Sequence, residues 1–118
     1  MIRIEMEDVE GNPYAPPVTM DVVGTYSERF LAEEERQGSA MLRGRRRKPT
    51  GKMVREQQIA KAAACVVGWD GVMDGKEPVP CTPENVLRVL TAAPWMREQV
   101  EEAMNDHAGF SNRSSAPS

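Results

Sequence analysis

The chain has 118 residues and a formal net charge of −3, and 40% of its residues are apolar while only 5% are aromatic. This length suits one domain, and the acidic balance excludes a protein whose whole surface is built to neutralise nucleic-acid phosphates. Because large rings are scarce, the hydrophobic core must depend on Val, Leu, Met and Ala side chains.

Two cysteines, Cys65 and Cys81, are too few for the disulfide framework of a small secreted domain. The sequence also opens without the charged and apolar regions of a secretion signal. Its longest apolar stretch, Ala62 to Val67, is much shorter than the roughly 20 residues that span a bilayer. We therefore expect a protein of a reducing cytoplasm that does not enter a membrane.

Residues 1–24 are predicted to form a β-hairpin, because apolar and polar residues alternate on both sides of a loop rich in Gly and Pro. An isolated hairpin is only marginally stable in water, so its apolar face must pack on helices or on another chain. The apolar positions of the two strands are Ile2, Ile4, Met6, Val18, Met20 and Val22.

Residues 25–43 are predicted to form a helix that starts at a Thr or Ser cap, with Phe30 and Leu31 facing inward. Gly38 and Ser39 are weak helix formers, so we expect a break or fraying there.

Residues 44–52 are expected to form an exposed basic linker, since Gly and Pro interrupt a run of like charges. This run could contact an acidic partner segment or nucleic acid. Aromatic side chains that stack on bases are missing nearby, which favours a solvated linker over a nucleic-acid site. The candidate contacts for an anionic partner are Arg43, Arg45, Arg46, Arg47 and Lys48.

Residues 53–110 are predicted to be a helical C-terminal part. Its first helix runs from Met53 to Val67, is terminated by Gly68, and is followed by a turn that begins at Trp69. An Asp-Gly turn then indicates a compact connector with room for a small ribbon. The expected apolar stripe of the first helix is Val54, Ile59, Ala60, Ala63 and Val67.

Two short helices complete this part. Thr82 followed by Pro83 is typical of a capped helix start, and Pro94 can open the last helix. In the last helix Met96, Val100, Ala103, Met104 and His107 recur at helical spacing opposite three glutamates, so one face should pack and the other should be solvated.

The sequence predicts no catalytic, cofactor or metal site, and hence no enzyme. Asp106 and His107 are adjacent on a predicted helix and point in different directions, and no motif supplies a nucleophile. The two cysteines and one histidine are too scattered for a structural zinc site. Trp69 and Trp95 are either binding hot spots or core anchors, and their exposure decides between the two.

The segment VVGWDGVMDGKEPVPCTPENVLRVLTAAPWMREQVEEAMNDHAGF, residues 66–110, resembles the C-terminal part of siphophage tail assembly chaperones. The sequence departs from that pattern at Glu77 and at His107 to Gly109. The residues that carry the resemblance, in order, are Gly68-Trp69, Asp74-Gly75-Lys76, Thr82-Pro83-Glu84-Asn85, Pro94-Trp95-Met96-Arg97-Glu98-Gln99 and the stretch from Asp106 to Phe110.

The resemblance implies a chaperone that acts in the host bacterial cytoplasm during infection and is absent from the mature virion. Such a protein binds the tape measure protein and keeps it soluble until tail tube subunits polymerise around it. The tail tube protein and a second copy are further partners that the resemblance allows. The alternatives are a structural or head–tail joining protein retained in the virion, and a nucleic-acid adaptor that uses the basic linker.

If the protein is such a chaperone, its partner should contact apolar side chains of the C-terminal part. Ordinary core filling explains two of these side chains, Met96 and Met104, equally well. The candidate partner-binding residues are Trp69, Trp95, Met96, Val100 and Met104. The fold class we predict is α+β, a mainly helical small domain over residues 1–110 with an N-terminal β-hairpin, followed by a disordered tail over 111–118.

Truncation after Phe110 should be tolerated, because the polar segment SNRSSAPS has no apolar anchor for a core. We expect the truncated chain to express in soluble form with an unchanged thermal melt. Loss of soluble expression would contradict this prediction.

Overall fold

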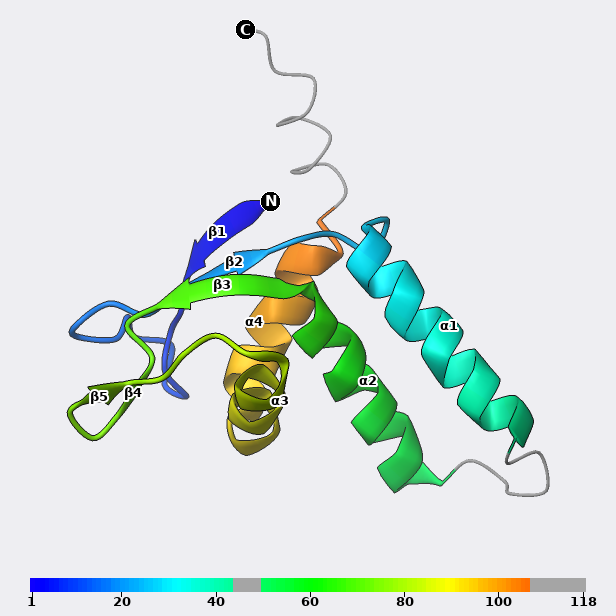
Figure 1. Ribbon diagram of the computed structural model, residues 1–118. Helices are drawn as coiled ribbons and strands as arrows, with labels where there is room; N and C mark the ends of the chain where they lie inside the picture. The colour runs from blue at the N-terminus through cyan, green and yellow to red at the C-terminus, as the bar shows by residue number, and fades with distance from the viewer. Residues whose placement is uncertain (44–49, 107–118) are drawn as a thin grey trace, which may run out of the picture.

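The computed structural model describes residues 1–43 and 50–106, in which helices pack against a small antiparallel sheet (Figure 1). The chain is α+β and mainly helical, as the sequence predicts. The elements are β1 (Ile2–Glu5), β2 (Thr19–Val22), α1 (Glu28–Arg43), α2 (Gly51–Cys65), β3 (Val66–Asp70), β4 (Met73–Asp74), β5 (Glu77–Pro78), α3 (Pro83–Ala92) and α4 (Pro94–Met104).

The predicted hairpin is confirmed: β1 and β2 pair antiparallel, with Ile2 opposite Val22 and Ile4 opposite Met20. Alternation sends Met20 and Val22 into the core, where both are fully buried. On the opposite face of the sheet, the guanidinium of Arg3 contacts the Asp21 carboxylate with an Nε to Oδ1 distance of 2.8 Å. This hydrogen bond lowers the pKa of Asp21.

A third strand was missed by the sequence reasoning. Val66 and Trp69 belong to β3, which pairs antiparallel with β2, so the expected helix to Val67 and the turn at Trp69 were wrong. The strand begins directly after Cys65, where the Val23 amide donates to the Cys65 carbonyl at 2.8 Å. The free edge of β2 offers unpaired backbone groups, and pairing with them overrides a local helical pattern.

The helix α1 runs unbroken through Gly38 and Ser39, so the expected break was wrong. Contacts with α2 hold it in place: the Gln37 side-chain amide donates to the Gln57 carbonyl at 3.0 Å. Leu31 was expected to face inward but is 49% exposed, because it lies about a third of a turn round the helix from Gln37, which faces α2.

The helix α2 begins at Gly51, two residues before the predicted start, because the Thr50 hydroxyl accepts the Met53 amide at 3.2 Å and caps it. Residues 51 and 52 are therefore helical, while 44–49 lie outside the described residues. The same is true of the predicted tail, 111–118.

The face of α2 that is buried differs from the predicted stripe. Ile59, Ala62 and Cys65 are buried, whereas Val54 and Val67 are exposed. The alanines of α2 lie on several sides of the helix, so the spacing of apolar residues does not show which of two neighbouring faces is buried. Packing against α3 and α4 decides between them.

The last two helices start where the sequence predicts. The Thr82 hydroxyl accepts the Asn85 amide at 3.2 Å with Pro83 in the first turn of α3, and Pro94 opens α4. The small ribbon is also confirmed, since β4 and β5 pair antiparallel. No helix in the described ranges is long and apolar enough to cross a bilayer.

Two leucines of α3 provide a test of which side chains form the core. Leu90 is fully buried and Leu87 is 43% exposed. Leu90→Ala should lower the free energy of unfolding by about 2–5 kcal/mol, because it removes apolar contacts and leaves a cavity. Leu87→Ala should lower it by less than about 1 kcal/mol. Urea unfolding followed by circular dichroism measures both, and equal losses would contradict the assigned core.

Candidate partner-binding site

Three of the five predicted partner-binding residues lie in the protein's own core. Met96, Val100 and Met104 are 8%, 0% and 6% exposed, and they pack on the face of α4 that meets the rest of the molecule. Val100 and Met104 are closed to a partner while this fold is intact, and Met96 shows only a small part of its side chain in a groove that it lines with Tyr14 and Val72. Their apolar pattern is therefore explained by core filling, the alternative that the sequence left open.

Trp69 and Trp95 are partly buried and each anchors a distant segment. The indole N–H of Trp69 donates to the Val79 carbonyl at 2.8 Å, which ties β3 to the segment after β5. The indole N–H of Trp95 donates to the Tyr14 hydroxyl at 2.8 Å, which ties α4 to the loop between β1 and β2. Both tryptophans therefore have a structural role in the isolated chain.

Only the first residue of the basic run lies within the described residues. Arg43 is the last residue of α1, and 44–49, which include Arg45, Arg46, Arg47 and Lys48, lie outside the described residues.

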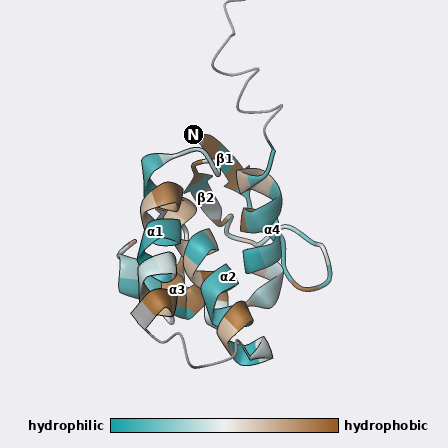
Figure 2. Cartoon of the chain, turned by 90° about the vertical axis from the view of Figure 1, so that its right-hand side faces the viewer, coloured by the Kyte–Doolittle hydropathy of each residue, from teal (hydrophilic) through white to brown (hydrophobic). Residues whose placement is uncertain are grey.

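The helix α1 exposes apolar side chains that sequence reasoning did not assign to a site. Among its described side chains only Gln37, a polar residue, is buried. Leu31 is 49% exposed and Leu42 is 75% exposed, and their spacing of eleven residues places them on one face of the helix. In Figure 2, α1 and α2 both carry hydrophobic segments among hydrophilic ones.

Polar contacts and one cation–ring contact link α1 to α2. The Arg29 guanidinium donates to the Ala64 carbonyl at 2.7 Å, and the Lys61 ammonium lies 3.9 Å from Glu34 and 5.9 Å from the centre of the Phe30 ring. Contacts of this kind between exposed groups contribute little stability. The helix α1 is thus less strongly anchored than α2, α3 and α4, which supply much of the core.

A shallow groove of about 270 Å³ lies between α1, α2 and α3. Ala60, Ala63 and Ala64 of α2 line it, and the partly exposed Leu87 of α3 contributes an apolar side chain. Small side chains allow another helix to approach closely. The Leu31–Leu42 face lies on the other side of α1 from this groove, since Leu31 is about 160° round the helix from Arg29 and Glu33, which line the groove. These two surfaces of the α1–α2 pair, one on each side of α1, are the candidate partner-binding site, which we call the hairpin site.

The signal for this site in the sequence was the position of Leu31 and Leu42, three helical turns apart. It was missed because Leu31 was assigned to the core and Leu42 was assigned to no face of the helix.

The two cysteines are not activated nucleophiles. Burial raises the pKa of the Cys65 thiol to about 11, and burial also raises the pKa of the Cys81 thiol. Because the thiolate is the reactive form, both side chains are mainly protonated at neutral pH, which slows their reaction.

A thiol reagent should react with the two cysteines at different rates, because their exposure to solvent differs. Cys65 is fully buried and Cys81 is partly exposed. At pH 8 we expect Ellman's reagent to modify Cys81 first, with a slow second phase from Cys65 that follows unfolding. The fast phase should vanish in Cys81→Ser and persist in Cys65→Ser, and a fast phase that depends on Cys65 would contradict the assigned burial.

Comparison with known proteins places the chain among phage-related proteins. The sequence pattern of the YdaY prophage protein family matches residues 25–116, from the segment before α1 to beyond α4. No curated protein and no solved structure matches the chain. The family match includes both helices of the hairpin site and the region that resembles tail assembly chaperones. Since it extends over most of the sequence, the chain belongs to the YdaY prophage protein family.

Proposed function

We propose that this prophage protein is a tail assembly chaperone, which binds the tape measure protein of its phage and keeps it soluble until tail tube subunits enclose it. The observation that supports this most is the exposed apolar face of α1. In proteins most helical stability comes from packing an amphipathic face, yet α1 buries only Gln37 among its described side chains. Leu31 and Leu42 stay exposed in the described part of the chain, and a partner that packs on α1 would bury them.

The chemistry of the hairpin site suits a helical client. A long helical protein with apolar stripes needs a binding surface that offers apolar side chains and close backbone approach. The alanines of α2 allow that approach, and Met41, which is 42% exposed, is a flexible side chain that adapts to imprecise partners. Binding of this kind requires no catalytic group.

The test is co-expression with the tape measure protein encoded near this gene, followed by affinity purification and measurement of the soluble fraction of the larger protein. We expect the two proteins to copurify in moderate salt. The variant that carries Leu31→Glu and Leu42→Glu should lose the complex, because each leucine contributes roughly 1.5 kcal/mol or more when buried, or about tenfold in affinity.

Val9→Glu is the matched control, since Val9 is 70% exposed but lies in the loop between β1 and β2. It introduces one carboxylate, against two in the test variant, away from the hairpin site and should leave copurification unchanged. Circular dichroism melts verify that all variants are folded. No association, with the chain found in finished particles, would instead support a structural protein, and salt-sensitive binding of DNA or RNA would support a nucleic-acid adaptor.

A further inference from the structure

The strand β1 has an unpaired outer edge. It lies at one side of the sheet, with β2 between it and β3. The Met6 amide donates to the Val18 carbonyl at 2.7 Å, and inter-strand bonds of antiparallel strands alternate. The backbone groups of Arg3 and Glu5 therefore point away from β2. No strand of the described residues pairs with them.

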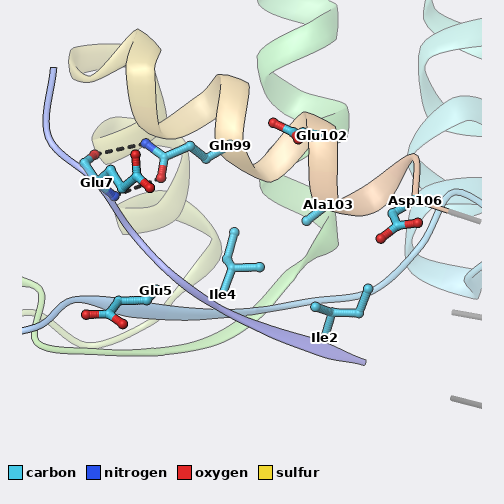
Figure 3. Close-up of a pocket in the computed structure, with 8 residues that line it drawn as sticks. All are labelled: Ile2, Ile4, Glu5, Glu7, Gln99, Glu102, Ala103 and Asp106. Atoms are coloured by element: carbon cyan, nitrogen blue, oxygen red, sulfur yellow. Dashed lines mark hydrogen bonds between the residues drawn. The ribbon is translucent and has the colours of Figure 1, made fainter. Parts of the chain in front are cut away.

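A side chain already occupies the end of this edge. The Glu7 amide donates to the Gln99 carboxamide oxygen at 2.8 Å, and the Gln99 side-chain N–H donates to the Glu7 carbonyl at 2.9 Å (Figure 3). A carboxamide has the same donor and acceptor as a peptide group, so Gln99 acts as one residue of a partner strand. The edge upstream of Glu7 can accept the same pairing from a main chain.

A groove of about 580 Å³ runs beside this edge, between β1 and α4. Ile2 and Ile4 line it from the strand and Ala103 lines it from the helix, which makes its floor apolar. Carboxylates border the floor on both sides. They belong to Glu5, Glu7, Glu102 and Asp106.

The charge of the groove identifies the kind of partner. The one basic residue of β1, Arg3, contacts Asp21 of the neighbouring strand rather than the groove carboxylates. Basic side chains with long aliphatic stems fit an apolar floor with acidic borders, because the stems cover apolar surface while the charged ends reach the carboxylates. A metal ion does not fit, since within the described residues no three His, Cys, Asp or Glu side chains are grouped to hold one.

A second copy of β1 is disfavoured as the occupant. Pairing two β1 strands would bring the acidic borders of two grooves together, and the register that places Glu5 opposite Glu5 sets like charges facing each other, which is destabilising. The register that places Arg3 opposite Glu5 would compete with the contact between Arg3 and Asp21. Charged residues on a sheet edge discourage self-association in this way.

We propose that the groove between β1 and α4 binds an extended basic segment of a partner protein, which adds to β1 as a further strand. Its backbone pairs with Arg3 and Glu5, while alternate Lys or Arg side chains cover Ile2 and Ile4 and reach Glu102. This mode of recognition takes affinity from main-chain hydrogen bonds and specificity from alternate side chains. The groove is formed by β1 and α4, away from the hairpin site, so either proposal can fail alone.

The test titrates the isotopically labelled full chain with an acetylated hexapeptide in which Lys and Thr alternate, at low salt. Near saturation, hydrogen exchange of the Arg3 and Glu5 amides should slow by about tenfold, because strand hydrogen bonds protect amides from exchange. Two control peptides separate the contribution of charge from that of main-chain hydrogen bonds. A Glu–Thr repeat should not bind, and a Lys–Pro repeat keeps the charge but lacks half of the amide donors and should protect neither amide.

A pair of α4 variants tests the acidic border. Glu102→Gln should weaken the Lys–Thr peptide by roughly two- to fivefold, as expected for one exposed ion pair. Glu98→Gln removes the same charge from an exposed position on α4 outside the groove, and it should leave the affinity unchanged.

Four results would overturn the proposal. The first is a Lys–Thr peptide that leaves the Arg3 and Glu5 amides unprotected, and the second is equal protection by the Lys–Pro peptide. The third is protection in the free chain that disappears on truncation after Asp106, which would make the protein's own C-terminal segment the occupant. The fourth is protection that rises with protein concentration alone, which would identify a second copy.

Discussion

The pairing of β2 with β3 is the contact on which the rest of the structure depends. It places β2 in the centre of the sheet, so that its backbone is bonded on both sides. Because β3 follows α2 without a loop, the same pairing fixes where α2 leaves the sheet. Val66 on β3 is 1% exposed and lies opposite Val22, which joins the sheet to the core formed with α3 and α4. Loss of this strand pair would therefore release α2 as well as the sheet edge.

The distribution of apolar side chains divides the molecule into two parts of unequal stability. The sheet, α3 and α4 enclose most of the buried residues, and both tryptophans fasten loops to this part through their indole N–H groups. By contrast α1 contributes the partly buried Phe30 to the core, makes polar contacts with α2, and fully buries only Gln37 among its described side chains. Segments with few buried apolar contacts open most easily, which suits a surface that exchanges partners.

The two proposed binding surfaces use different physical interactions. The hairpin site offers leucine, methionine and alanine side chains, so its affinity depends on apolar burial and resists salt. The groove beside β1 offers carboxylates and main-chain groups, so its affinity falls as salt screens the charges. The family match begins at residue 25, so it includes the hairpin site but not β1.

Local patterns in the sequence determined the features that depend on neighbouring residues. The hairpin alternation, the Thr82–Pro83 cap, the start of α4 at Pro94 and its buried face all follow from spacing and side-chain chemistry. Tertiary structure alone decided that Val66 continues as a strand, because the partner edge of β2 is about 45 residues away in sequence. It also decided which face of the alanine-rich α2 is buried, and that Leu31 is exposed rather than packed. These outcomes depend on contacts between distant segments, which a local pattern does not contain.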